Sequence, residues 1–405
     1  MNKYILDYVK NNSKTVFKDL SEPQKKCMRL LVRRLFKSGT GILRHLGRDC
    51  EQLPKTIGQK FSHHLGNIDL LAPVESFADR KLLSLLPEKD GVIAYDLSDT
   101  NKKSAKKIEN LTKCFDGSRR QKSQGFFLNG VGFGKFLWRL RVHDNTRKFL
   151  NQVRKEILDH LINITTGMSV IFALDRGNDD KNWFEHLDNK KARFIVRLKK
   201  NREVVIKQTG EKVKVEDLPE GRYQILLTES GTEQRKKPKY REYELVIYKK
   251  KKSKKHPLRL LISVYLDPAQ EYSNKRIANL YLQRWGVENS FKQIKTVLKL
   301  ESIRVLSFKK FQNLVSLQHF CLLLNELLFH RINEAVDMFA QNLAISQISF
   351  HYKKFIKHYT LTVNSQSFFK FLQDIFPEFY HHRKKRLHQD QSNIWSLFSI
   401  KPKTF

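Results

Sequence analysis

Two apolar segments that each end in an aspartate place the strongest constraint on the fold of this 405-residue chain. Residues 91–96 read GVIAYD and residues 169–175 read SVIFALD, so the two runs end in Asp96 and Asp175. A short, continuous apolar run is typical of a strand that is buried on both faces. We therefore expect two central strands, each of which presents a carboxylate at its end.

The segments between and after these runs complete an alternating α/β pattern. Residues 125–134 and 135–142 are strand candidates with glycines between them, and residues 146–163 carry apolar side chains at helical spacing. A short helix around Trp183 and a strand from Ala192 follow. Three strands, a helix, a strand, a helix and a strand are the order expected of a ribonuclease H-like core with a mixed sheet.

Residues 201–257 predict a β-rich insertion into this core. Four segments, 203–207, 210–215, 222–228 and 243–248, alternate apolar and polar residues. This alternation is typical of antiparallel strands with one solvated face. Residues 258–266 then return to an apolar strand, which rejoins the core.

Both ends of the chain predict helices. Residues 1–88 contain short helix candidates with recurring Lys and Arg, either a DNA-binding domain or a helical domain with solvated charges. The sequence thus divides into a helical DNA-binding domain (1–88), a first part of the catalytic core (89–200), the β-rich insertion (201–257), a second part of the core (258–310) and a helical C-terminal region (311–405).

Residues 281–295, YLQRWGVENSFKQIK, follow a segment from Asn274 that contains no Pro or Gly before Trp285. At about 100° per residue, Tyr281, Arg284, Glu288 and Lys295 lie within about 60° of one another on a continuous helix. The neighbouring face is apolar. We therefore expect an amphipathic helix that carries a carboxylate among two cations and a phenol at the border of the core.

The overall charge indicates a polyanionic partner. The chain has 77 Lys plus Arg against 41 Asp plus Glu, a formal charge of +36. Nucleic acid is the common polyanion for such a protein, although charge alone does not separate DNA from RNA.

The N-terminus lacks the apolar core of a signal peptide, and the most apolar stretch, 314–329, contains polar residues. We expect no membrane contact and a cytoplasmic, nucleoid-associated protein.

The spacing of Tyr281, Arg284, Glu288 and Lys295 resembles the Tyr-Arg-Glu-Lys signature of DDE transposases, in the insertion-sequence branch numbered four. The β insertion before the signature and the two upstream aspartates are similar to the same family. The resemblance implies that Asp96, Asp175 and Glu288 are the catalytic metal ligands. It further implies that Tyr281, Arg284 and Lys295 hold DNA phosphates and that Trp285 stacks on an extruded base, although a tryptophan more often packs in a core.

Three carboxylates suit this chemistry because phosphodiester cleavage by two metals needs hard oxygen ligands around two Mg²⁺ ions about 4 Å apart. Mn²⁺ would be able to substitute. Asp99 is an alternative to Asp96 as the first ligand, since both lie in the segment DLSD. We favour Asp96 because it directly follows the apolar run.

The sequence therefore predicts a DNA transposase that cleaves terminal inverted repeats in double-stranded DNA and transfers the strands into target DNA, as a homodimer on the DNA. Two other functions use the same features. One is a ribonuclease H-like nuclease that cuts without strand transfer, and the other is a non-catalytic DNA-binding protein derived from a transposase.

Overall fold

The computed structural model describes residues 2–343, apart from gaps at 49, 51, 103–104, 106, 117–120, 232–237, 251–255, 268 and 270. The chain forms two compact units, which we treat separately. The helical unit comprises Met1–Ala78, Thr100–Gly125 and Lys292–Phe405, and the sheet unit comprises Asp79–Asp99 and Phe126–Phe291. The predicted helices of residues 344–405 lie outside the described residues.

The sheet unit contains the predicted core in the predicted order. The elements are β1 (Gly91–Asn101), β3 (Gln121–Phe133), β4 (Phe136–Val142), α6 (Leu150–Ile164), β5 (Val170–Leu174), α7 (Lys181–Asn189) and β6 (Phe194–Arg197). In space, β4 pairs with β3, and β3, β1, β5 and β6 follow as neighbours. The pair β3–β4 is antiparallel, whereas β1–β5 and β5–β6 are parallel. This arrangement confirms the ribonuclease H-like mixed sheet.

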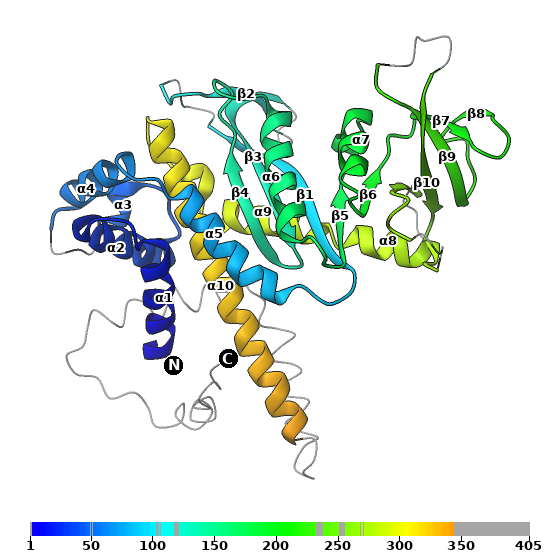
Figure 1. Ribbon diagram of the computed structural model, residues 1–405. Coiled ribbons are helices and arrows are strands. Elements are labelled where there is room, and N and C mark those ends of the chain that lie inside the picture. The colour runs from blue at the N-terminus through cyan, green and yellow to red at the C-terminus, as the bar shows by residue number, and fades with distance from the viewer. Residues whose placement is uncertain are drawn as a thin grey trace. The chain divides into compact units, whose positions relative to one another are not determined.

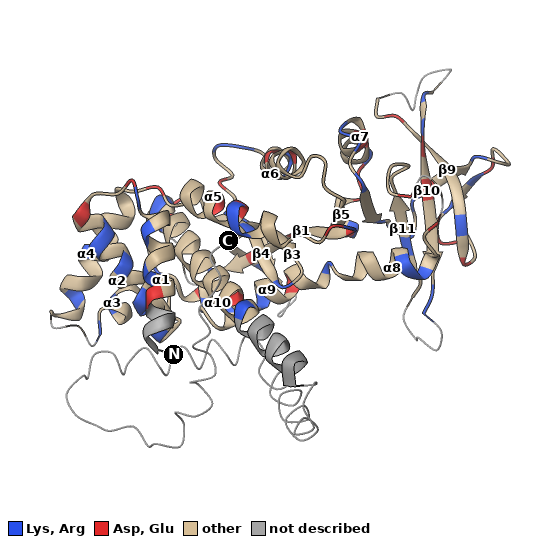
Figure 2. Cartoon of the chain, turned by 60° about the horizontal axis from the view of Figure 1, so that its bottom comes forward, with Lys and Arg blue, Asp and Glu red and all other residues tan. Residues whose placement is uncertain are grey.

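The central strands are apolar because helices cover both faces of the sheet. All five residues of β5 and the first five of β1 are buried. In the sheet unit, α6 and α7 lie on one face, and α8 (Asn274–Leu282) and the start of α9 (Trp285–Thr296) lie on the other (Figures 1 and 2). Burial on both faces removes the alternation that a half-exposed strand would show.

The β-rich insertion is confirmed and continues the core sheet. Its strands are β7 (Glu203–Ile206), β8 (Lys212–Lys214), β9 (Gly221–Thr228) and β10 (Tyr240–Tyr248), all paired antiparallel. β10 pairs with β11 (Leu258–Ile262), and β11 pairs antiparallel with β6. The insertion is therefore an extension of one sheet.

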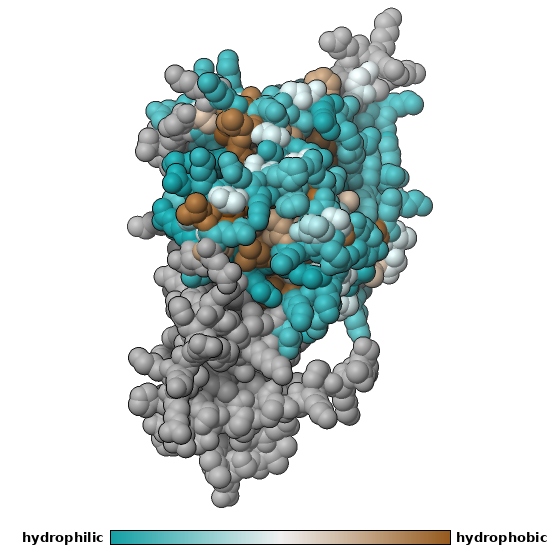
Figure 3. Space-filling model, turned by 90° about the vertical axis from the view of Figure 1, so that its left-hand side faces the viewer, coloured by the Kyte–Doolittle hydropathy of each residue, from teal (hydrophilic) through white to brown (hydrophobic). Residues whose placement is uncertain are grey.

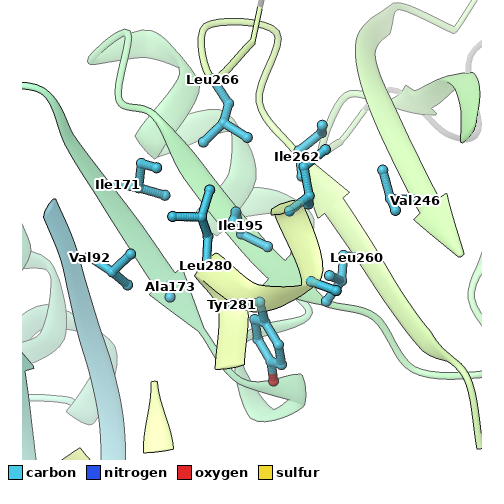
Figure 4. Close-up of a cluster of buried hydrophobic side chains, with 12 residues drawn as sticks. Val92, Ile171, Ala173, Ile195, Val246, Leu260, Ile262, Leu266, Leu280 and Tyr281 are labelled. Atoms are coloured by element: carbon cyan, nitrogen blue, oxygen red, sulfur yellow. The ribbon is translucent and has the colours of Figure 1, made fainter. Parts of the chain in front are cut away.

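A hydrophobic cluster holds α8 against this extended sheet (Figure 4). Ile277, Leu280 and Tyr281 of α8 pack among buried side chains from five strands, β1, β5, β6, β10 and β11. Each of these three α8 residues is at most 6% exposed. This packing fixes the chain that leads into Arg284 and buries Tyr281, which the sequence pattern placed at the polar border of the helix.

The structure corrects the prediction of one continuous helix through residues 274–295. Gln283 and Arg284 form a turn between α8 and α9, in which Arg284 N donates to Tyr281 O at 3.1 Å and Val287 N donates to Arg284 O at 3.1 Å. A close approach fixes the position of the first turn of α9. A Cβ on Gly286 would lie 1.8 Å from the Gly134 carbonyl oxygen, so only glycine lets α9 begin here against the β3–β4 turn.

The helical unit confirms the predicted N-terminal helices and the first of the C-terminal ones. Its elements are α1 (Asn2–Val16), α2 (Glu22–Ser38), α3 (Leu43–Leu46), α4 (Pro54–Gly66), most of α5 (Leu71–Leu82), β2 (Thr112–Asp116), η3 (Leu300–Ser302) and α10 (Phe308–Leu343). The buried Asn313 of α10 donates to the carbonyls of Leu65 and Ile68 at 2.8 and 2.9 Å and accepts from Leu70 N at 2.9 Å. These bonds tie the end of α4 to α10.

On the face where α2–α4 lie, hydrophilic residues cover most of the coloured surface and hydrophobic residues form smaller areas between them (Figure 3). Among the described residues, none of the helices has both the length and the apolar run needed to cross a bilayer.

Candidate active site

Asp96 and Asp175 lie side by side in the sheet unit because their strands are parallel neighbours. The pairing of β1 with β5 runs from Gly91 with Val170 to Tyr95 with Leu174. Asp96 and Asp175 each follow directly after the last of these pairs. The parallel register therefore brings both aspartates to the same edge of the sheet, as the sequence pattern predicted.

A short turn holds Asp175 in place. Asp175 caps the 3₁₀ turn η2 (Arg176–Asn178), and its Oδ1 accepts from Gly177 N at 3.0 Å and from Asn178 Nδ2 at 2.6 Å. Asp179, which directly follows this turn, is buried and accepts from Lys199 N at 2.7 Å and from Arg202 Nε at 2.8 Å. The loop that carries Asp175 is thus fixed by bonds on both sides.

Arg284 links the third carboxylate to the first. Its Nη1 lies 3.2 Å from Asp96 Oδ2, and its Nη2 donates to Glu288 Oε1 one helical turn away. The Arg284 side chain is 8% exposed, whereas that of Glu288 is 47% exposed. A buried cation between two carboxylates therefore joins the start of α9 to the end of the apolar part of β1.

The electrostatics show that the three carboxylates share one environment. Burial, together with the charges of Asp175 and Glu288, raises the pKa of Asp96 to about 6, while Arg284 and the Leu97 N–H act in the opposite direction. Neighbouring like charges disfavour the ionised form. Burial is the largest of these causes, and Arg284 offsets the rise in the pKa of Asp96 only in part.

The donor set fits a hard divalent cation in its chemistry, since carboxylate oxygens are the ligands that Mg²⁺ and Mn²⁺ prefer. The part of the chain that the structure describes contains no group of three His, Cys, Asp or Glu side chains arranged to hold a metal ion. Arg284 bonds to Asp96 and Glu288 instead. The three carboxylates therefore fit a divalent cation by their charge and by the type of donor atom.

The structure also places the other predicted site residues. Tyr281 is 1% exposed and belongs to the hydrophobic cluster, with the Arg284 guanidinium 5.7 Å from its ring centroid. Trp285 is 50% exposed, so the alternative that it packs in the core is wrong. Lys295 lies in α9, seven residues after Glu288, and is partly buried. Asp99 lies three residues after Asp96 in β1, so the two side chains point to opposite faces of the sheet.

Two polar residues near Asp175 were missed by the sequence analysis. Arg154 of α6 donates from Nη1 to Asn178 Oδ1 at 2.5 Å, and Asn178 in turn bonds to Asp175. A signal was present, because Arg154 occupies the helical stripe of Leu150, Ile157 and Leu161, where a core residue is expected.

The mixed sheet with helices on both faces has the arrangement of the ribonuclease H-like fold. Residues 142–324 match the family model described as "Transposase DDE domain". The match includes Asp175 and Glu288, begins after Asp96 and covers less than half of the chain. It supports a DDE transposase, the class that the sequence pattern predicted.

One similar solved structure is described as the cryo-EM structure of a piggyBac transposase synaptic complex with hairpin DNA. It shares 10% sequence identity with this chain and has a TM-score of 0.40, over 98% of this chain and 76% of the other. No curated protein matches the chain.

Proposed function

We propose that this protein is a DNA transposase that cleaves DNA at the ends of a mobile element and transfers the freed strands into target DNA. The observation that carries this proposal is that three carboxylates far apart in sequence come together: the buried Arg284 bonds to both Asp96 and Glu288, and Asp175 ends the strand beside that of Asp96. The match to a transposase domain over residues 142–324 supports the same reaction class.

Asp96, Asp175 and Glu288 would hold two Mg²⁺ ions. When bound, such ions activate a water or a 3′ hydroxyl and stabilise the leaving oxygen in phosphodiester cleavage. The protein's own contribution is positioning. The parallel strands fix two carboxylates side by side, and α9 brings the third, so catalysis needs no covalent protein intermediate.

The residues around the carboxylates have roles in this proposal that follow from their chemistry. Arg284 offers a guanidinium fork that can hold either carboxylates or a DNA phosphate. Trp285 presents an exposed ring on which a base can stack. Lys295 supplies a point charge for phosphate. The buried Tyr281 would reach DNA only if α8 moved, and in the present geometry it packs beneath Arg284.

Double-stranded DNA is the partner that the charge distribution favours. Lys and Arg occur on α2 and α4 of the helical unit and on β10 and neighbouring strands of the sheet unit (Figure 2). Each unit therefore offers cations that can bind the phosphates of DNA. We further propose that the chain acts as a dimer on its DNA and belongs to the insertion-sequence branch numbered four.

The experiment that tests this function uses a labelled duplex carrying the DNA that flanks the gene, incubated with the full-length protein and Mg²⁺ or EDTA. We expect metal-dependent nicks at the boundary of the element, reduced at least 100-fold by Glu288→Ala, because no other group replaces the missing ligand. Asp99→Asn is the matched control and should cut normally.

The products separate the rival functions. Joined products that contain target DNA identify a transposase, whereas cuts without joining identify a nuclease. Tight, salt-sensitive binding without any cut, equal for the wild type and Glu288→Ala, would contradict an enzymatic function and leave a DNA-binding protein.

A further inference from the structure

Arg154 is a charged residue in the otherwise apolar stripe of α6, and it lies next to the turn that follows Asp175. Arg154 stacks over the Trp183 ring with its guanidinium carbon 4.5 Å from the ring centroid, and it lies 6.0 Å from the centroid of Tyr95. Its Nη2 donates to Asn151 Oδ1 at 2.8 Å. These contacts fix the guanidinium plane, so that Nη1 points at one partner, Asn178.

The chemistry of these groups fixes the orientation of the Asn178 amide. A guanidinium has donors and no acceptor, so the atom of Asn178 that faces Arg154 must be the carbonyl oxygen Oδ1. The amino group Nδ2 then faces Asp175, to whose Oδ1 it donates at 2.6 Å. Asn178 is 3% exposed, so water does not compete for either side of the amide.

This chain of bonds distinguishes the two oxygens of Asp175. Oδ1 accepts both the Gly177 N–H and the Asn178 amide, whereas the described residues donate no hydrogen bond to Oδ2. A donor bound to a cation on its other side is polarised and forms a stronger bond. Asn178 therefore couples Arg154 to Asp175 through two hydrogen bonds, although Arg154 and Asp175 do not bond to each other.

We propose that Arg154 and Asn178 are positioning residues that orient Asp175, so that Oδ1 is held by the protein and Oδ2 is presented to a divalent cation. This inference rests on the proposed function, in which Asp175 is a metal ligand. Groups that hydrogen-bond a metal ligand commonly change metal affinity 10- to 100-fold when they are replaced.

The structural alternative is that Arg154 only helps α6 to pack on the sheet. In that case its loss would lower stability and leave metal affinity unchanged. A bond between α6 and the following helix α7 allows a matched comparison. His186 of α7 lies 2.6 Å from Asp159 Oδ1 of α6, and neither residue bonds to Asp175.

The test measures Mn²⁺ binding to the full-length, DNA-free protein by electron paramagnetic resonance, together with the melting temperature. Asn178→Asp has nearly the same shape and still accepts from Arg154, but it cannot donate to Asp175. We expect it to weaken Mn²⁺ binding about 10- to 100-fold. We expect Arg154→Met to act in the same direction, Arg154→Lys to retain part of the affinity, and Asp159→Asn to bind Mn²⁺ as the wild type does.

Unchanged or tighter Mn²⁺ binding by Asn178→Asp would overturn the inference, as would an equal loss in Asp159→Asn. If Asn178→Asp does not fold, the comparison of Arg154→Met with Arg154→Lys decides in the same way.

Asp175→Asn separates this inference from the proposed function. If Asp175→Asn binds Mn²⁺ and cleaves DNA normally, the proposed function itself fails. If only Asp175→Asn loses Mn²⁺, the positioning role alone fails.

Discussion

At the residue scale, Asp96 shows the cost of assembling this site. Burial and the charges of Asp175 and Glu288 raise its pKa to about 6, against an ordinary value near 4. Between these two values the folded state binds more protons than the unfolded chain does. Stability therefore decreases as the pH rises from about 4 to 6 and stays lower above that range.

We predict that Asp96→Asn, which removes this charge, increases stability at pH 7.5 by up to about 2 kcal/mol and changes it little at pH 4. Arg284 and Leu97 N donate to different oxygens of Asp96, so the single carboxamide oxygen can keep one of these two bonds. Thermal unfolding of both proteins at the two pH values, without metal, measures the difference. A loss of stability at pH 7.5 would show that the ion pair with Arg284 outweighs the repulsion.

At the element scale, the junction of α8 and α9 determines where Glu288 lies. Gly286 lies against the Gly134 carbonyl, and Ser290 Oγ donates to Lys135 O at 3.2 Å, so that α9 begins directly on the β3–β4 turn. Sequence periodicity predicted one helix here, because nothing in the local pattern reveals a contact with a turn about 150 residues earlier.

We predict that Gly286→Ala destabilises the protein by roughly 1–3 kcal/mol, since the added methyl group would meet backbone rather than a movable side chain. It should also lower DNA cleavage by displacing Glu288. Urea unfolding and the cleavage assay measure the two effects. Asn289→Ala, an exposed position in the same helix, is the control and should be nearly neutral. Wild-type stability in Gly286→Ala would mean that α9 can shift without consequence.

At the scale of the whole molecule, the sequence predicted what depends on local pattern. The order of the core elements along the chain, the insertion and the aspartates that follow two buried strands were predicted from apolar runs and are confirmed. The sequence placed residues 258–266 back in the core but did not predict that this strand pairs with β6, because pairing partners leave no periodic signal. Nor did it predict that Arg154 reaches Asp175 through Asn178, because such a chain depends on tertiary packing.

We propose that the fold assembles one metal site from Asp96, Asp175 and Glu288. The most direct measurement is Mn²⁺ binding by the full-length protein, followed by electron paramagnetic resonance, for Asp96→Asn, Asp175→Asn and Glu288→Gln. Asp99→Asn, whose side chain lies on the opposite face of β1, is the control. We predict that each of the first three variants loses Mn²⁺ affinity at least tenfold and that Asp99→Asn retains it. Retained affinity in Asp96→Asn together with a loss in Asp99→Asn would contradict the assignment.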